Sequence, residues 1–269
     1  MSSTDHHPQD SLGATKKRKD AFSELMLPKP KQTKSTTNPS SQSTKSNSFS
    51  NSRNALLTYI LNPADFPNQV VTYNENTVLI RDAFPKATLH LLLLPRDASK
   101  RDLHPREAFD DPVFLAMIRE EVAASVKLAA SELSRLIGPF SRSNKARITA
   151  MESDNPPDSL PPGRDFVKDL RVGIHAHPSM NHLHIHIISQ DMHSDRLKHR
   201  KHYNSFNTDF FIPLDAYPLV EDDQRRLTGF QNANLGKDFK CWRCGKMFGN
   251  KFTMLKDHLK EEFKAWKEE

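Results

Sequence analysis

The sequence predicts an α+β protein with a mainly antiparallel sheet and flanking helices, followed by a small C-terminal module. Short apolar segments typical of strands stand before and after one long amphipathic segment typical of a helix. Both cysteines lie together near the C-terminus as a C-x-x-C pair, which points to a separate small module. We therefore expect three parts: a tail over residues 1–53, a central domain over 54–220 and a module over 221–269.

The N-terminal tail is predicted to be disordered. Its residues are almost all Ser, Thr, Asn, Lys, Pro and Asp, which cannot bury enough apolar surface to offset the entropy of ordering. The basic run Lys16-Lys17-Arg18-Lys19 is open to two interpretations, a nuclear import signal or a generic solubilising segment. The first of these predicts a nuclear protein.

Composition limits the classes of function. With 269 residues, of which 36% are hydrophobic, the chain can form one medium domain plus appendages. A net charge of +6 is compatible with a polyanionic partner without proving one. No segment approaches the roughly 18 apolar residues that span a bilayer, and the N-terminus has no apolar signal segment. We expect no membrane partner.

The first half of the central domain contains a short helix, three strands and a long helix. Residues 55–61 form a helix that stops before Pro63, and residues 70–73 and 77–81 form two strands joined by a turn. Residues 88–94 are strongly apolar, which favours a central strand. Residues 113–137 carry apolar side chains at three- and four-residue steps, which predicts one long amphipathic helix.

The second half contains three further strands. They are predicted over residues 147–151, 171–176 and 182–188, with a proline-rich surface loop over 155–163. A connecting helix is expected over residues 224–235.

The last of these strands carries three alternating histidines. His182, His184 and His186 share one face, because alternate side chains of a strand point to the same side. Solvent-facing polar alternation is one interpretation. A metal site is another, although the outer pair lies about 13 Å apart by strand rise. A third is covalent catalysis, in which a neutral imidazole attacks phosphorus and water cleaves the resulting phosphoramidate. Leu183, Ile185 and Ile187 then face the core.

The triplet, completed by Ile187 and Ile188, resembles the His-φ-His-φ-His-φ-φ signature of the histidine triad (HIT) superfamily. That resemblance implies a HIT-type sheet with His184 as the nucleophile, while His182 and His186 position it and the phosphate oxygens. Residues 81–87 and 90–95 resemble the nucleoside-binding hairpin of the superfamily, in which Asp82 would hold the ribose hydroxyls. The alternative for Asp82 is a simple turn residue.

Three further segments, over residues 173–180, 188–191 and 201–208, closely resemble the aprataxin branch of the superfamily, in its form without a forkhead-associated domain. That resemblance implies a hydrolase that removes AMP from 5′-adenylated DNA ends or nicks, acting as a monomer, with AMP as product. His175 would assist at the phosphates and leaving group, and Ser189 would contact phosphate. No organic cofactor and no catalytic metal are implied.

The C-terminal module is predicted to bind structural zinc. Cys241, Cys244 and His258 have the spacing of a zinc finger, with Phe248 at a position that builds the small core of such fingers. Glu262, one helical turn after His258, is the expected fourth ligand. Three ligands with a water, or a redox cysteine pair, are the alternatives. Leu255 occupies the other core position.

DNA contacts are expected on both parts of the chain. For Lys201 a solvated basic surface is the alternative, and Tyr203 stands where the vertebrate pattern has Trp. We expect loss of zinc to weaken DNA affinity more than turnover of free nucleotides. Other functions compatible with the sequence are a HIT hydrolase of dinucleoside polyphosphates or AMP phosphoramidates, and a non-catalytic nucleic-acid-binding adaptor. The candidate DNA-binding residues are Lys86, Lys201, Tyr203, Ser205 and Lys246.

Overall fold

The computed structural model describes residues 53–269. The predicted disordered tail and the basic run at 16–19 lie outside these residues. Within the described part of the chain, no helix is both long and apolar enough to cross a membrane.

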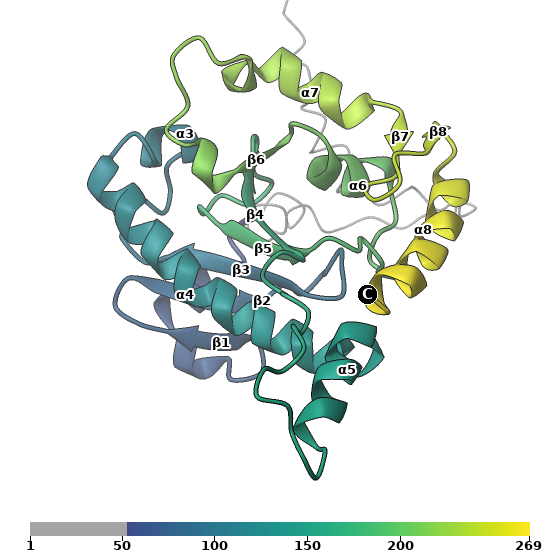
Figure 1. The fold of residues 1–269 in the computed structure, drawn as a ribbon. Helices are drawn as coiled ribbons and strands as arrows, with labels where there is room; N and C mark the ends of the chain where they lie inside the picture. Colours follow the sequence, from purple (N-terminus) through teal and green to yellow (C-terminus); the bar gives the residue numbers. More distant parts are fainter. Residues whose placement is uncertain (1–52) are drawn as a thin grey trace, which may run out of the picture. The chain divides into compact units, whose positions relative to one another are not determined.

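The sheet has six strands, and each hydrogen-bonded neighbour is antiparallel, in the order β1-β2-β3-β5-β4-β6 (Figure 1). This confirms the predicted fold class. The long apolar segment forms β3, which is buried along its whole length at the centre of the sheet. The strands are β1 (Val70–Tyr73), β2 (Thr77–Arg81), β3 (His90–Pro95), β4 (Leu170–His175), β5 (Ile185–Ser189) and β6 (Phe211–Pro213).

Helix α4 (Pro112–Ile137) lies across one face of this sheet (Figure 1). It begins where the Asp111 carboxylate accepts the backbone N–H groups of Val113 and Phe114, a side-chain cap that satisfies two otherwise unpaired donors. Its apolar stripe packs on the side chains of β3 and β5 that point to this face. The sheet side of this core includes Leu91, Leu93, Ile185 and Ile187.

Short helices complete the central domain. They include α2 (Leu57–Leu61), α3 (Pro105–Ala108) and α6 (Arg200–Asn207). Single 3-10 turns are found at Pro63–Asp65 and Leu214–Ala216. Neither α3, α6 nor β6 was expected from the sequence.

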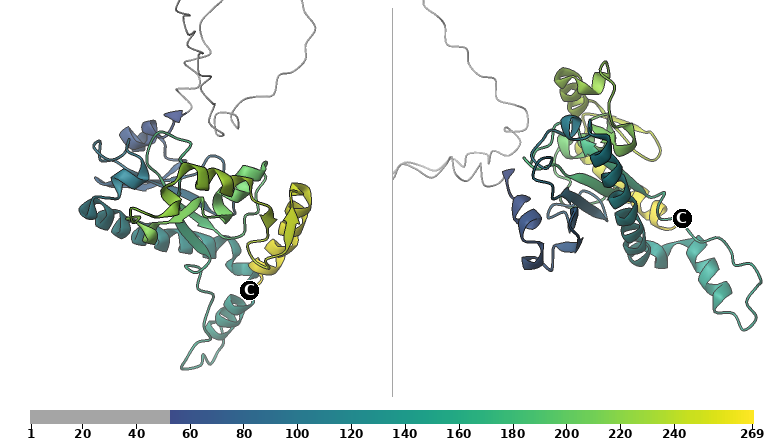
Figure 2. Two further views of the ribbon diagram at one scale, coloured as in Figure 1. Left: turned by 90° about the horizontal axis from the view of Figure 1, so that it is seen from above. Right: turned by 90° about the vertical axis from the view of Figure 1, so that its left-hand side faces the viewer.

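The strand expected over residues 147–151 is wrong. This segment is the second half of α5 (Arg142–Met151), which follows the 3-10 turn Gly138–Phe140. Ile148 and Met151 stay exposed, so they do not find the sheet face that a strand would need. Figure 2 shows α5 and the loop after it projecting away from the sheet.

Two other boundaries differ from the expectation. Regular pairing in β5 begins at Ile185, so His182 and His184 precede the strand. The connecting helix is interrupted at Leu227, which separates a 3-10 turn at Gln224–Arg226 from α7 (Thr228–Gly236).

The C-terminal module consists of the hairpin β7 (Phe239–Lys240) and β8 (Met247–Gly249) and the helix α8 (Phe252–Lys267). The end of α8 is anchored to the central domain by Trp266, which is 2% exposed. Its indole N–H donates to Asp169 at 2.9 Å. Arg164 pairs with the same carboxylate at 2.7 Å and donates to the Trp266 carbonyl at 2.6 Å.

Trp266→Ala is expected to destabilise the whole protein by about 3–5 kcal/mol, because it leaves a cavity and removes a hydrogen bond to a buried ion pair. Denaturant unfolding measures the change when it is monitored by circular dichroism of the backbone, a signal that does not depend on the removed tryptophan. Met254→Ala is the matched control, since Met254 lies on the same helix but is 53% exposed. Equal stability of the two variants would mean that α8 is not anchored through Trp266.

Candidate active site and zinc finger

The candidate active site lies on the sheet face opposite α4. In the β3–β5 register His90 is opposite Ile188 and Leu92 is opposite His186, so both histidines point away from the α4 core. Phe206 of α6 packs against this face, with its ring centroid 5.3 Å from His90 and 5.2 Å from His186. The sheet register and α6 therefore enclose a group of histidines.

His184 is held by the backbone just before β5. Its Nδ1 lies 2.7 Å from the carbonyl oxygen of His182. A carbonyl can only accept, so Nδ1 carries the proton and Nε2 carries the lone pair. The backbone that supplies this carbonyl is itself fixed by the N–H of Leu183, which donates to the backbone carbonyl oxygen of Arg101 at 2.7 Å. The tautomer of His184 is thus set by main chain.

His186 is oriented by His90, which the sequence had placed in a strand without assigning it a role. The backbone N–H of Lys86 donates to His90 Nδ1 at 3.3 Å, which leaves the His90 proton on Nε2. That nitrogen lies 2.9 Å from His186 Nδ1, so His186 carries its own proton on Nε2. Asp82 Oδ2 is also 3.3 Å from His90 Nδ1. A histidine in an otherwise apolar central strand was the available sequence clue.

Several imidazole nitrogens on this face or just before β5 are buried and have no hydrogen-bond partner among the described residues: Nε2 of His175, Nδ1 of His182 and Nε2 of His186. The His175 and His186 rings are 4.5 Å apart, and those of His184 and His186 are 5.0 Å apart. Unpaired buried polar atoms are costly, so such a cluster is typical of a site completed by a polar ligand.

Burial makes these histidines poor bases. Desolvation is the main cause that lowers the pKa of His184 below its ordinary value of 6.5, and it holds the pKa of His175 and of His186 well below that value. The pKa of His90 falls to about 4 for the same reason. At neutral pH the four rings are uncharged, which leaves the His184 lone pair available for reaction.

Asp82 and Lys86 lie at the mouth of this site. Asp82 Oδ1 accepts the backbone N–H of Phe84 at 2.7 Å, a contact that stabilises the turn. The carboxylate is therefore a turn residue and also lies beside His90. The Lys86 amine contacts the Phe84 carbonyl oxygen, and burial lowers the pKa of this amine. Asp82, His90 and His186 could also hold a metal ion, but His90 faces its two neighbours through opposite ring nitrogens.

The structure corrects the predicted phosphate contact of Ser189. Its side chain is fully buried, donates to Asp191 at 2.5 Å and accepts the backbone N–H of Leu89 at 3.0 Å. Both capacities of the hydroxyl are therefore used inside the fold, where they tie β5 to the start of β3.

Tyr203 is also misassigned as a DNA contact, whereas the contact predicted for Ser205 stays a prediction. Tyr203 is 1% exposed, and its hydroxyl donates to the Lys240 carbonyl at 2.8 Å and accepts the Trp242 N–H at 3.0 Å. Ser205 is 9% exposed and its hydroxyl points to the His202 carbonyl. Both face inward from α6. Lys201 is half-buried on that helix, and Lys246 lies exposed just before β8, near the Phe248 ring.

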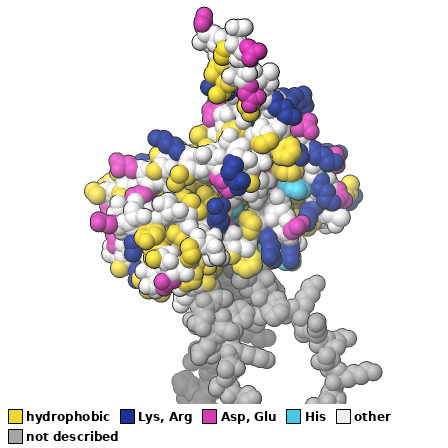
Figure 3. Space-filling view, turned by 90° about the horizontal axis from the view of Figure 1, so that it is seen from below, with side chains coloured by type: hydrophobic (Ala, Val, Ile, Leu, Met, Phe, Trp, Pro, Cys, Tyr) yellow, Lys and Arg dark blue, Asp and Glu magenta, His cyan; other side chains and the backbone are white. Residues whose placement is uncertain are grey.

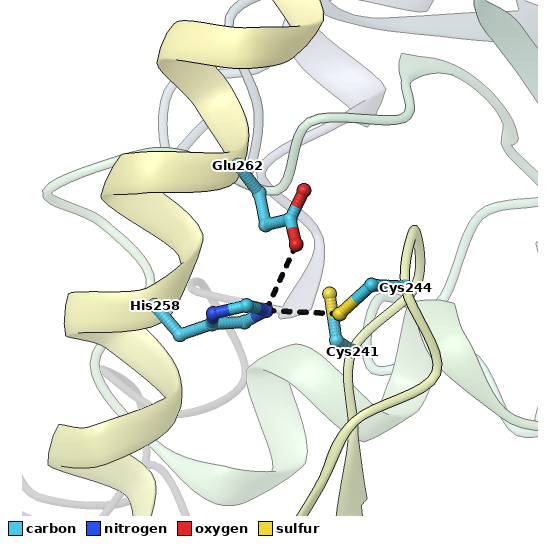
Figure 4. Close-up of side chains that lie close together, drawn as sticks. All are labelled: Cys241, Cys244, His258 and Glu262. Carbon is cyan, nitrogen blue, oxygen red and sulfur yellow. Dashed lines mark hydrogen bonds and ion pairs between the residues drawn. The ribbon is translucent and has the colours of Figure 1, made fainter.

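The four expected zinc ligands converge between the β7–β8 hairpin and α8 (Figure 4). Their ligand atoms all lie within 4.8 Å of one another. Nε2 of His258 is 3.1 Å from Cys244 Sγ and 3.1 Å from Glu262 Oε1. Zinc bond lengths of about 2.0–2.3 Å place tetrahedral ligand atoms roughly 3–4 Å apart, so this set fits zinc. Phe248 and Leu255 are buried beneath it.

The module shares a core with the active-site face. Tyr203 and Phe206 of α6 belong to the same buried cluster as Phe239 and Cys241 of the finger and Ile188 of β5. Because Phe206 also covers His90, His175 and His186, one layer of side chains connects the zinc ligands to the histidines. The finger is therefore not an independent appendage.

Comparison with known proteins identifies the class. A family model described as a HIT domain matches residues 64–193, and one described as a C2HE / C2H2 / C2HC zinc-binding finger matches residues 207–265. Fold and site thus define a HIT-domain protein with a C-terminal zinc finger.

The branch follows from closer relatives. The chain is 39% identical over 222 residues to an aprataxin-like protein of Saccharomyces cerevisiae, covering 79% of this chain and 96% of the relative. It is 36% identical over 215 residues to an aprataxin-like protein of Schizosaccharomyces pombe, covering 80% of this chain and 82% of the relative. The chain belongs to the aprataxin-like family of HIT-domain proteins. This membership supports a nucleotide hydrolase.

Solved structures agree with this. The crystal structure of the aprataxin ortholog Hnt3 in complex with DNA matches with a TM-score of 0.63 at 33% identity, covering 80% of this chain and 96% of that chain. The crystal structure of Hnt3 from Schizosaccharomyces pombe matches with a TM-score of 0.62 at 33% identity, covering 78% of this chain and 92% of that chain.

Proposed function

We propose that this protein removes AMP from 5′-adenylated DNA ends through a covalent AMP–His184 intermediate. The observation that carries the proposal is the neutral His184 ring, whose Nδ1–H is fixed on a backbone carbonyl while the lone pair stays on Nε2. This is the state that a histidine nucleophile requires. The proposed division assigns residues 54–220 to catalysis and 221–269 to the zinc finger, with the tail over 1–53.

In the first step Nε2 of His184 attacks the phosphorus of AMP in the 5′–5′ pyrophosphate, and the P–O bond to the DNA 5′-phosphate breaks. The released DNA keeps a 5′-phosphate. In the second step water attacks the same phosphorus, the P–N bond breaks, and AMP and free His184 are restored. The Nε2–H of His186 is suited to donate to a phosphate oxygen, because His90 holds the proton on that side.

The other polar groups of the site have proposed roles of their own. His175 and His182 supply unpartnered ring nitrogens for the phosphates and the leaving group. Asp82 is proposed for the ribose hydroxyls and Lys86 for phosphate, since both lie beside His90 at the mouth of the site.

DNA is the proposed substrate class because Hnt3, a similar protein, has been crystallised with DNA. The charge distribution supports this. Lys256 and Lys260 of α8 line the same small cleft as loop residues 193–195, and the adjacent Arg196 lies over the Phe84 ring at 5.6 Å. Figure 3 shows Lys and Arg side chains beside histidine on one side of the drawn face. Such a surface suits sequence-independent contact with phosphates. A monomer acting in the nucleus completes the proposal.

The decisive experiment compares hydrolysis of 5′-adenylated nicked DNA with that of diadenosine tetraphosphate by the full chain. We expect kcat/KM for the DNA substrate to be higher by about two orders of magnitude, because only DNA engages the basic surface. In the double variant Lys256→Ala, Lys260→Ala, turnover of DNA should fall while turnover of the dinucleotide stays unchanged. Preference for the dinucleotide would instead identify a small-molecule hydrolase.

The pH profile offers an independent test of the nucleophile. His184 reacts when neutral, and burial lowers its pKa, so activity should persist from neutral pH downward and fall only below pH 6.5. The profile of kcat/KM on a free nucleotide substrate measures this without interference from DNA binding. An acid limb centred at or above pH 6.5 would contradict a buried neutral nucleophile.

A further inference from the structure

Arg243 lies inside the zinc-binding turn, between the two cysteine ligands, and reaches across to the ligand on α8. Its Nη1 is 2.7 Å from Oε2 of Glu262. The other carboxylate oxygen, Oε1, lies 3.1 Å from His258 Nε2 and so faces the ligand cluster. One oxygen of Glu262 is thereby turned to the metal site and the other is held by the guanidinium. A second nitrogen of Arg243 contacts Glu269 near the end of α8.

The need for such a contact follows from charge. Zinc with two thiolates and two neutral histidines is electrically neutral, whereas replacing one histidine by a carboxylate leaves one net negative charge. The Glu262 side chain is only 11% exposed, so water stabilises this extra charge poorly. Arg243 places a positive charge directly against it, in partly buried surroundings where the attraction is weakly screened.

We propose that Arg243 is the charge partner of this carboxylate-containing zinc site. It is a positioning residue: it does not bind the metal, but it holds Oε2 so that Glu262 offers Oε1 alone, and it offsets the charge that distinguishes this ligand set from one with two histidines. Outer contacts of this kind commonly govern how tightly a metal is held.

The test is a double-mutant cycle on the full chain, with zinc affinity measured by competition against a chromogenic chelator. Arg243→Ala should weaken zinc binding by about 10- to 100-fold. In the Glu262→His background, where the fourth ligand is neutral, the same change should cost less than about threefold. Equal losses in both backgrounds, or no loss in the first, would overturn the proposal.

A second set of variants decides the matter if Glu262→His does not fold. Arg243→Lys keeps the charge and should retain more zinc affinity than Arg243→Gln, which keeps only a hydrogen-bonding group. Cobalt substituted for zinc should show shifted visible absorption in Arg243→Ala, because the ligand field changes with the orientation of Glu262. Equal zinc affinity in the Lys and Gln variants, with an unshifted cobalt spectrum, would refute the charge role.

Two controls separate this role from ordinary stabilisation of the helix. Lys260→Ala removes a positive charge from the same helix, where Lys260 pairs with the exposed Asp257, and should leave zinc affinity unchanged. Glu269→Gln removes the other partner of Arg243 and should change it little. A loss in either control as large as that of Arg243→Ala would assign the effect to general charge or to the end of α8.

Discussion

Replacing His184 with alanine is expected to abolish AMP release from adenylated nicked DNA, with a loss on the order of 10⁴-fold or more. The imidazole is the proposed nucleophile, and the neighbouring rings are proposed to contact the phosphates and the leaving group, so we expect none of them to replace its lone pair. Single-turnover assays with labelled AMP measure the loss. Because the P–N bond of the adduct is labile in acid and stable in alkali, quenching in alkaline denaturant should trap labelled AMP on the wild-type chain and not on the variant.

His182→Ala is the matched comparison. The contact that orients His184 comes from the main-chain carbonyl of His182, which this variant keeps. It should therefore lose only the contribution of one ring nitrogen to the phosphates, roughly 10- to 100-fold, and should still form the adduct. Both variants should bind DNA as the wild type does. If His184→Ala turned over at the rate of His182→Ala, His184 would not be the nucleophile.

Most of the sheet was predictable because its strands are short apolar segments that stand before and after one long amphipathic helix. The errors concerned the secondary structure of individual short segments. In residues 147–151 the side chains of Ile148 and Met151 are exposed, and a strand there would need a neighbouring strand for its backbone hydrogen bonds, whereas a helix makes these bonds within itself. Likewise α6 is a polar segment whose buried side is contributed by only a few residues, among them Tyr203 and Phe206. Tertiary packing, rather than periodicity, makes that segment a helix.

At the site, residue types predicted the chemistry and the fold decided which atoms can perform it. The triplet indicated His184, but the fixation of its Nδ1 by a main-chain carbonyl involves no side chain and leaves no mark on the sequence. His90 depends on a diagonal relation between β3 and β5 that only the register reveals. Ser189 was misassigned because a hydroxyl looks the same in sequence whether it faces a ligand or Asp191.

The finger is where the structure most changes an expectation. From sequence, zinc loss should weaken DNA affinity more than turnover of free nucleotides. The structure places Cys241 at 2% exposure in a core that also holds Tyr203 and Phe206. The Tyr203 hydroxyl is hydrogen-bonded to the backbone of Lys240 and Trp242, the residues on either side of that cysteine. Disorder of the zinc site would therefore release α6 from the histidines.

We now expect Cys241→Ala, or removal of zinc by a chelator, to lower turnover of adenylated DNA and of diadenosine tetraphosphate together. Zinc binding contributes on the order of 10 kcal/mol to folding of such modules. If loss of zinc destabilises the shared core by about 3 kcal/mol, the unfolding midpoint should fall by roughly 10 °C. Calorimetry and the two turnover assays, run on the same samples, measure these effects.

Met247→Ala serves as the control, because Met247 lies in the same hairpin but is 58% exposed, so it should change neither stability nor turnover. A chelated protein that still hydrolyses the dinucleotide at the wild-type rate, with the catalytic domain unfolding at its original temperature, would show that the finger acts only in binding DNA. The shared core predicts the opposite. Phe206 of α6 covers three of the histidines, and the hydroxyl of Tyr203, on the same helix, is hydrogen-bonded to the residue next to Cys241. The zinc site therefore supports the geometry of the active site through α6.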